Sequence, residues 1–307
     1  MEINVWGIRM KKKKKGFWKR NIGLVFVMPW LVGLLVFKLY PFAGSFIYSF
    51  HSYNLFKTAS FTGLENYKYI LGDKLIIKAF IQTFKYAFLT VPLELMFALF
   101  IAYILNNKIR GLNFFRTIYY IPSILGGSVS IAVLWKFLFK TEGLVNIMLG
   151  ALGIPAFNWL GNPDGAFFVI VLLRVWQFGS PMVIFLAALK GVQGDLYEAA
   201  AIDGAGKWKQ FFQITVPLIT PVIFYNFVTQ LCHKFQEFNG PFIVTQGGPL
   251  RSTTLVSLLV YNEAFKRNEM GLASAIAWLL FLVIMTFTAV AFISQKYWVY
   301  YADEDGR

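Results

Sequence analysis

Charged and amide side chains recur at helical spacing within an apolar stretch of the chain near residue 230. Gln230, His233, Lys234 and Glu237 follow one another at intervals of three, one and three residues, which places them on one face of a helix. Aromatic and aliphatic residues fill much of the remaining surface. One polar face on an apolar helix favours a translocation cavity for a polar solute. The alternative is a contact within the helix, from Lys234 or His233 to Glu237.

Two more charges, Glu94 and Arg174, lie inside other apolar stretches. A charged side chain at the centre of a bilayer costs about 2.5–3.5 kcal/mol on insertion scales. If both faced lipid, the pair would cost about 5–7 kcal/mol. We therefore expect these side chains to face the protein interior or an aqueous cavity, or to form an ion pair with each other.

The residues that nucleotide hydrolysis or covalent catalysis would need are missing. Gly206-Lys207 resembles the end of a phosphate-binding loop, but that motif needs glycine and serine or threonine where this chain has Ala201 and Trp208. Two histidines and one cysteine in the whole chain offer neither a metal cluster nor a nucleophile with its base. The sequence therefore predicts a chain that is not an enzyme.

The composition sets the environment of these side chains. Of 307 residues, 57% are hydrophobic and 14% are charged, and the mean hydropathy is +0.58. Soluble domains have about 45–50% apolar and about 25% charged residues, so this is an integral-membrane composition. Cys232 is the single cysteine and cannot form an intrachain disulfide.

Six stretches approach or exceed the roughly 20 apolar residues that a membrane-spanning helix needs. The sequence thus predicts an all-α integral membrane protein with six transmembrane helices at residues 22–42, 79–106, 114–139, 165–189, 214–236 and 270–295.

The basic residues predict the orientation of these spans. Eight of them precede the first span and place the N-terminus in the cytoplasm: Arg9, Lys11–Lys15, Lys19 and Arg20. Six crossings then put the C-terminus inside as well, with 16 basic residues on cytoplasmic segments against 8 outside. The predicted organisation is a basic tail at 1–20, a membrane domain at 21–295 with a cytoplasmic loop at 190–217, and a second cytoplasmic tail at 296–307. The excess of basic residues behind the net charge of +14 is therefore explained by membrane topology and by contact with the lipid bilayer. It does not predict binding to nucleic acid.

The cytoplasmic loop carries a strong local pattern. Asp195 and Glu198 have the spacing of a capping box, and alanines at 199–201 favour a helix. Gly204 supplies a residue that adopts positive φ at little cost, which predicts a tight turn before a second helical segment at 207–212. The alternative is an ordinary interfacial loop between two spans.

The spacing of this loop resembles a known signature. Glu198-Ala199-Ala200, Gly204, Ile214 and Val216-Pro217 are similar to the EAA motif of permease subunits in ATP-binding-cassette importers. Two further matches are to carbohydrate-type permeases: Thr245–Pro249 with Tyr261–Phe265 and Gly271–Ala275, and Phe115–Pro122 with Asn146–Leu149. The resemblance covers residues 85–300, and the chain lacks the extra N-terminal spans and large outer domain of the larger maltose permease.

The resemblance implies a fold, partners and a mechanism. The fold is the type I importer permease, in a bacterial cytoplasmic membrane. The partners are a second homologous permease, two ATPase subunits that bind ATP and Mg²⁺, and an external solute-binding protein; this chain itself holds no cofactor. Substrate passes by alternating access. The coupling segment that enters the ATPase is formed by Glu198, Ala199, Ala200, Asp203 and Gly204.

The resemblance also implies where substrate binds. Sugar-contacting residues of the family precede the Thr-x-Gly-Gly-Pro segment, and others lie in the fourth span. The matching positions here are Gln230, His233, Lys234, Glu237, Gln177 and Gly179, with Arg174 one turn away. The family example has neutral and aromatic residues where this chain has charged ones, which suggests an acidic oligosaccharide as the substrate.

Three alternatives remain open at this point. One is a permease for glycerol phosphate or another small solute in the same family. Another is an ion-coupled secondary transporter, which predicts an internal repeat that the sequence does not display. The third is a membrane enzyme, which would need a catalytic cluster.

Overall fold

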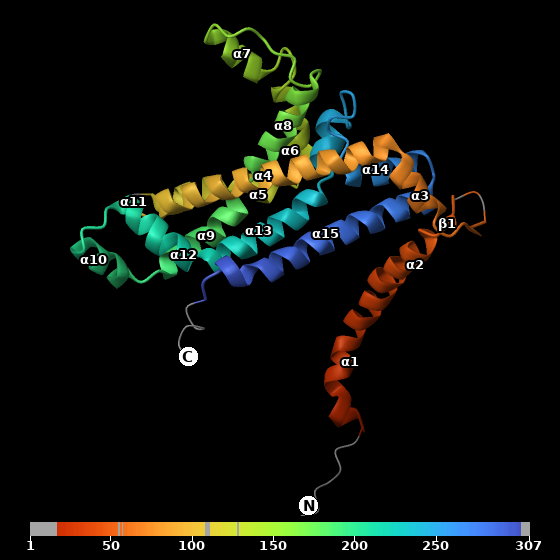
Figure 1. Ribbon diagram of the computed structural model, residues 1–307, viewed down its shortest axis with the longest axis horizontal. Coiled ribbons are helices and arrows are strands. Elements are labelled where there is room, and N and C mark those ends of the chain that lie inside the picture. The colour runs from red at the N-terminus through yellow and green to blue at the C-terminus, as the bar shows by residue number, and fades with distance from the viewer. Residues whose placement is uncertain (1–16, 55, 57, 108–110, 128, 302–307) are drawn as a thin grey trace, which may run out of the picture.

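A computed structural model (Figure 1) describes residues 17–54, 56, 58–107, 111–127 and 129–301. These residues are mostly helical, and they include one antiparallel ribbon in which β1 (His51–Ser52) pairs with β2 (Ser60–Phe61). The basic run Lys11–Lys15 and half of the predicted C-terminal tail, residues 302–307, lie outside the described residues.

Among the described residues, three helical segments are each long and apolar enough to cross a membrane, and the number is six when each of three bent helix pairs is taken as one span, which agrees with the six predicted spans. Three are continuous: α1 (Phe17–Leu34) with the π-helical turn η1 (Leu35–Leu39) and α2 (Tyr40–Tyr48), then α4 (Lys74–Asn106), then α15 (Met270–Trp298). Three are bent pairs: α5 (Leu112–Leu125) with α6 (Val129–Leu138), α8 (Pro163–Val175) with α9 (Gly179–Gly191), and the helical segment Lys207–Leu218 with α13 (Thr220–Phe235).

The bends were not expected from the sequence, which predicted each of these spans as one run. The angles between the paired helices are 100°, 42° and 66° in chain order. The third bend falls at Ile219, two residues before Pro221 in the first turn of α13. Proline has no N–H to donate to the preceding turn, so it begins a helix more readily than it continues one. The first bend follows Gly126 and Gly127.

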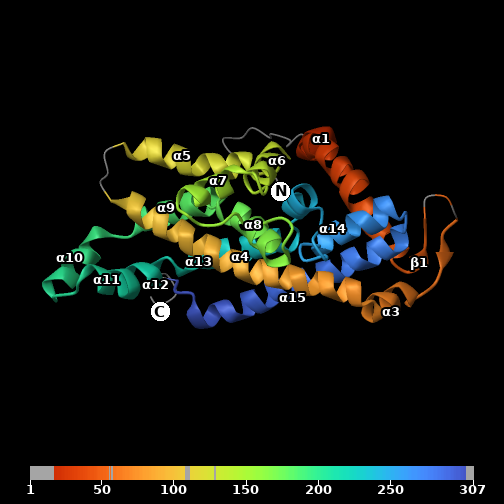
Figure 2. The ribbon, with the colours of Figure 1, turned by 90° about the horizontal axis from the view of Figure 1, so that it is seen from above.

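Short elements connect the spans. They are α3 (Glu65–Gly72), α7 (Leu144–Ala151), α10 (Gly194–Ile202), α11 (Lys207–Gln210), η2 (Phe211–Thr215), α12 (Val216–Leu218), η3 (Pro241–Thr245), α14 (Val256–Tyr261) and η4 (Asn262–Lys266). In Figure 1, α10 and the end of α15 lie toward one end of the long axis, α3 and β1 lie at the opposite end, and α7 stands apart at the top. Figure 2 shows α10 and β1 at opposite ends of the same long axis. This is the separation that the predicted topology requires.

Helix α4 is the centre of the core, where it packs against α8, α9 and α13. Its buried residues recur every three or four positions and form a stripe along the helix. Ala87, Ala98 and Ala102 on this stripe are completely buried, and such small residues let neighbouring backbones approach closely. Glu94 lies on the same stripe, so the packing of α4 carries a charged group into the core.

The first span forms an arm that stands away from the body (Figure 1). Its contact with α15 is local: the Trp278 indole Nε1 donates to Ser45 Oγ at 3.1 Å, and the Phe42 and Trp278 rings lie 4.6 Å apart. Large apolar side chains such as Phe26, Trp30 and Phe37 are exposed along the arm. These surfaces are available to lipid or to another subunit.

Asp73 begins the central helix, and its replacement gives a test of the fold. Its Oδ1 accepts from the backbone N–H of Leu75 at 2.7 Å and of Ile76 at 3.4 Å. We expect Asp73→Ala to lower the free energy of unfolding by about 1 kcal/mol because the cap is lost. Denaturant titration of the detergent-solubilised protein measures the change.

The matched variant Asp73→Asn separates the cap from the charge. Asparagine caps as well as aspartate, so stability near neutral pH should be nearly retained. The hydrogen bond from the Leu75 N–H holds the pKa of the Asp73 carboxyl below its ordinary value. The stabilisation that this shift provides is present above the unfolded-state pKa and is lost as pH falls through the folded-state value. Equal stability of Asp73→Ala and wild type would contradict the cap.

Candidate functional site

Four charged side chains meet in the core as two ion pairs. Lys234 Nζ on α13 lies 2.5 Å from Glu94 Oε2 on α4, and Arg174 Nε on α8 lies 3.4 Å from Glu237 Oε2 beyond α13. Of the alternatives for Glu94 and Arg174, a pair with each other is wrong, and Glu94 faces the protein interior as the first alternative expected. The alternative contact of Lys234 with Glu237 within one helix is also wrong. Each cation instead meets a carboxylate on a different segment, because α4 packs against both α8 and α13.

The Lys234–Glu94 ion pair is buried in the protein interior. The exposed fractions of the two side chains are 0% and 2%, and Lys234 Nζ also donates to Gln230 Oε1 at 3.0 Å. Lys234 and Gln230 were predicted to line a cavity, but the structure places them between α13 and α4. In this arrangement the Lys234–Glu94 ion pair links α13 to α4, and Gln230 bonds Lys234 from the same helix.

Arg174 contacts residues at three places where helices end: Gln177 between α8 and α9, Gly126 after α5 through Gln177, and Glu237 after α13. Its Nη1 donates to Gln177 Oε1 at 2.6 Å, and Gln177 Nε2 donates to the Gly126 carbonyl at 3.3 Å. Glu237 accepts from the Gly240 N–H at 3.1 Å. A Cβ at Gly126 would lie 2.3 Å from the Gln177 side chain, so a larger residue there would displace the Gln177 amide. The Arg174 side chain thus fixes the bends of two spans relative to the end of α13.

Gly179, also predicted as a substrate contact, lies at a helix–helix contact. It begins α9, and a Cβ at this position would lie 2.5 Å from the Tyr119 carbonyl oxygen of α5. The Ser123 hydroxyl of α5 donates to the Gln177 carbonyl at 2.7 Å. This glycine allows the close approach of α5 and α9 and does not line either of the cavities described next.

A polar pocket of about 270 Å³ opens at the outer end of α13. Its lining residues are Gly127, Arg174, His233, Gln236, Glu237, Phe238 and Asn239. Of the predicted substrate residues, the structure brings Arg174, His233 and Glu237 together here. Gln236 and Asn239 were missed, although Gln236 follows His233 by three residues and could have been found by continuing the exposed face of the helix.

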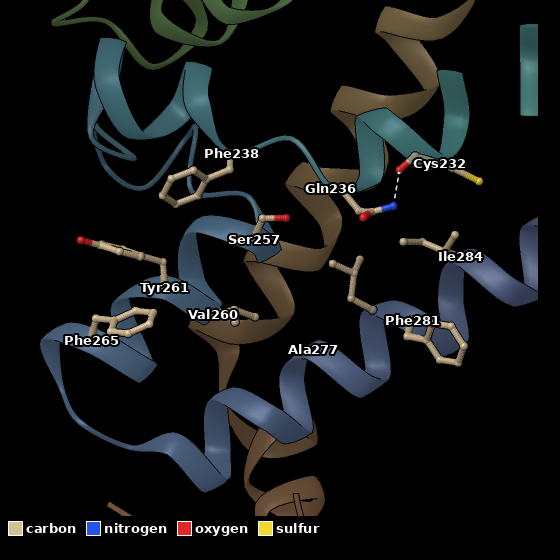
Figure 3. Close-up of a pocket in the computed structure, with 11 residues that line it drawn as sticks. Cys232, Gln236, Phe238, Ser257, Val260, Tyr261, Phe265, Ala277, Phe281 and Ile284 are labelled. Atoms are coloured by element: carbon tan, nitrogen blue, oxygen red, sulfur yellow. Dashed lines mark hydrogen bonds between the residues drawn. The ribbon is translucent and has the colours of Figure 1, made fainter. Parts of the chain in front are cut away.

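A larger cavity of about 720 Å³ adjoins the polar pocket. Figure 3 shows it between the end of α13, the α14–η4 segment and α15. Gln236 and Phe238 line both spaces. Its other walls are mainly aromatic and aliphatic, so a polar site and an apolar site share one boundary.

The predicted coupling segment forms α10 and the turn that ends it. The Ala205 N–H donates to the Ala200 carbonyl at 2.9 Å and the Gly204 N–H to the Ala201 carbonyl at 3.1 Å, which is a Schellman motif. Gly204 has a φ of +77°, as its position in this motif requires. The turn expected from the sequence is confirmed.

The beginning of α10 differs from the expected capping box. The helix starts at Gly194, its N-cap is Gln193, and no side chain caps it. Asp195 therefore lies within the first turn, where its negative charge interacts favourably with the positive end of the helix dipole. Its side chain does not cap a backbone N–H. The capping box predicted from Asp195 and Glu198 is wrong.

The surface of this segment is open. Glu198, Ala199, Asp203 and Gly204 are exposed and Ala200 is half-buried, while Ile202 is 88% exposed. Behind it, the Tyr197 hydroxyl bonds Thr215 Oγ1 at 2.8 Å, and Gln210 Nε2 donates to the Ala205 carbonyl at 2.9 Å. The loop is thus held to the following span while its small residues face outward.

The described part of the chain contains no group of three or more His, Cys, Asp or Glu residues placed to hold a metal ion. Cys232 is free and half-buried. The chemistry that the described site offers is hydrogen bonding and ion pairing with a polar solute.

Comparisons with known proteins agree on one family. The family described as binding-protein-dependent transport system inner membrane component matches residues 70–299. The chain is 41% identical over 304 residues to the probable ABC transporter permease protein YesP of Bacillus subtilis (strain 168), covering 97% of this chain and 98% of that protein. It is 34% identical over 273 residues to the trehalose/maltose transport system permease protein MalF of Thermococcus litoralis, covering 88% and 92%.

A third relative and a solved structure complete the comparison. The sn-glycerol-3-phosphate transport system permease protein UgpA of Salmonella typhimurium (strain LT2) is 33% identical over 288 residues, covering 92% of this chain and 97% of that one. A crystal structure of a bacterial ABC transporter involved in the import of the acidic polysaccharide alginate matches with a TM-score of 0.77 at 22% identity, covering 91% and 97%. That likeness shows the fold.

Proposed function

Since the chain belongs to the family of binding-protein-dependent transport system inner membrane components, we propose that it moves an oligosaccharide with acidic groups into the cytoplasm. It is the permease subunit of a carbohydrate ATP-binding-cassette importer and is not itself an enzyme. What the relatives leave open is the substrate, which has to be argued from the site.

The observation that carries the proposal is the polar pocket at the end of α13. Arg174 keeps its charge at any pH that the protein meets, and its side chain is 24% exposed, against 9% for its partner Glu237. The cation is therefore the more accessible member of the pair. A carboxylate on a sugar would compete with Glu237 for Arg174, while His233, Gln236 and Asn239 are placed to bond hydroxyl groups.

The proposed partners follow from the open surfaces. Two ATPase subunits, which bind ATP and Mg²⁺, would receive the exposed coupling segment around Ile202. A second permease would pack against the first span, whose arm leaves the body (Figure 1). An external solute-binding protein would deliver substrate on the side of α3 and β1. The complex would work by alternating access in a bacterial cytoplasmic membrane.

The test uses a double variant that removes both charges of the pair. Arg174→Gln/Glu237→Gln leaves no carboxylate stranded in the pocket. In proteoliposomes with the partner subunits and binding protein, we expect uptake of a uronic-acid disaccharide to fall about 10- to 100-fold, as expected for a lost charged hydrogen bond. Uptake of a neutral disaccharide should change little. Equal losses for both sugars, with an unchanged thermal unfolding curve, would contradict the acidic substrate.

Glycerol phosphate is the second candidate because UgpA is a relative. Its phosphate would also meet Arg174, but it has no chain of rings to fill the adjoining cavity. Including sn-glycerol 3-phosphate in the same uptake series decides between them. Preference of the wild type for this solute over every saccharide would replace the oligosaccharide as the substrate class.

A further inference from the structure

The larger cavity has one aromatic wall that the polar pocket lacks. Tyr261 lies between Phe238 and Phe265, with ring centroids 5.3 Å from each. Phe242 stacks on Phe238 at 4.8 Å and supports it from behind. Figure 3 shows Phe238, Tyr261 and Phe265 gathered at one end of the cavity, with Phe281 at the other.

Polar atoms are set among these rings. Gln236 Nε2 donates to the Cys232 carbonyl at 3.0 Å, which fixes the amide at the edge of the cavity. In Figure 3 the Ser257 hydroxyl points toward Gln236. Tyr261 also lines the cavity, and its hydroxyl points away from Gln236 and Ser257 in Figure 3. These groups supply both donors and acceptors beside the aromatic faces.

This combination suits a sugar ring better than a lipid chain. A pyranose ring presents apolar C–H groups on its faces and hydroxyl groups around its edge. An aromatic wall buries the former, and the Gln236 amide with the Ser257 hydroxyl bonds the latter. An acyl chain would leave the polar atoms of Gln236 and Ser257 facing hydrocarbon, which costs free energy when no partner is present.

Gln236 and Phe238 line both the polar pocket and the aromatic cavity, so the two spaces adjoin at these residues. A saccharide with one ring at Arg174 would therefore place its next ring beside Tyr261. We propose that the aromatic cavity is a second sugar subsite, which makes the permease select for chains of more than one ring. The inference rests on the proposed function, because it assigns the adjoining ring of the same substrate.

Chain length is the variable that tests this subsite. Uptake is measured at saturating substrate-loaded binding protein with two ladders of one to five rings, uronic-acid saccharides and neutral malto-saccharides. For Tyr261→Ala we expect the rate with chains of two or more rings to fall about tenfold, the equivalent of one lost aromatic contact. The rate with single rings should stay at the wild-type value.

Two matched variants control for folding and for the hydroxyl group. Tyr261→Phe keeps the ring and should retain most of the length preference. Phe292→Ala removes an exposed ring on α15 that contacts Phe224, outside the cavity, and should change neither ladder. A loss with Tyr261→Ala that is the same at every chain length, or no loss at all, would overturn the second subsite.

Cys232 gives an independent readout because it lines the cavity and is the single cysteine of the chain. With cysteine-free partner subunits, a trisaccharide should slow maleimide labelling of Cys232 and a monosaccharide should not. A labelling rate of Cys232 that is the same with and without the trisaccharide would overturn the subsite even if uptake is normal. A wild-type importer that takes up neither ladder would instead overturn the proposed function, and the subsite with it.

Discussion

Lys234→Met is expected to lower the free energy of unfolding by about 3–5 kcal/mol, because it leaves Glu94 as an uncompensated buried charge. The Glu94 side chain is 2% exposed, and Lys234 Nζ lies 2.5 Å from its Oε2. Water cannot replace the lost partner at that depth. A change of this size is a large fraction of the 5–15 kcal/mol by which most domains are stable.

The double variant Glu94→Leu/Lys234→Met gives the matched control. Replacing both members of a buried pair by apolar residues of similar size is often neutral or stabilising, so most of the loss should be recovered. Denaturant titration in detergent measures all three variants. If Lys234→Met alone stayed within about 1 kcal/mol of wild type, the charge would not be buried and paired as described.

Gly204→Pro is expected to reduce uptake at least about 100-fold, the equivalent of about 3 kcal/mol for a proline that its backbone position does not accept. Proline fixes φ near −65°, whereas Gly204 has a φ of +77°. It also removes the N–H that donates to the Ala201 carbonyl at 3.1 Å. The Schellman motif would be lost, and with it the shape of the proposed ATPase contact.

Gly206→Ala is the matched glycine control two residues away. Gly206 has a φ of −69°, and a Cβ there meets nothing within 4 Å, so uptake should be unchanged. Glu198→Ala on the exposed surface of α10 tests the contact without altering the turn and should weaken ATPase association. Wild-type uptake and ATPase association in both Glu198→Ala and Gly204→Pro would refute the coupling assignment.

Hydropathy was sufficient to predict the number of spans, because each crossing needs a long apolar run whatever its neighbours are. The bends could not be predicted in the same way. The break near Gly126 depends on the approach of Gln177 from another span, and no local pattern in the sequence records that contact. The bend before Pro221 had a local signal in the proline itself.

The ion pairs illustrate the limit for the candidate site. Helical spacing correctly grouped Lys234 with Gln230, which bond one another. It could not indicate which side of α13 faces α4, since that depends on packing between helices. The prediction therefore placed the buried Gln230 and Lys234 in the cavity and missed Gln236 on the exposed side of the helix. The other predicted residues Arg174, His233 and Glu237 do line the polar pocket.

The coupling segment was the most predictable part because its structure is local. A positive φ at Gly204 follows from the preference of glycine at that position of a helix end. The capping box failed for a local reason as well: α10 begins two residues earlier than the Asp195 cap required, with Gln193 as its N-cap. Whether Glu198, Ala199, Ala200, Asp203 and Gly204 touch an ATPase remains a proposal.

The most direct test of the importer assignment is uptake of a labelled oligosaccharide into proteoliposomes that contain this chain and its partner subunits. With ATP inside and binding protein outside, we predict uptake that stops when ATP is omitted or the binding protein is left out, and that does not respond to collapse of ion gradients. Uptake that persists without ATP and follows an imposed proton or sodium gradient would contradict the account and identify the chain as a secondary transporter.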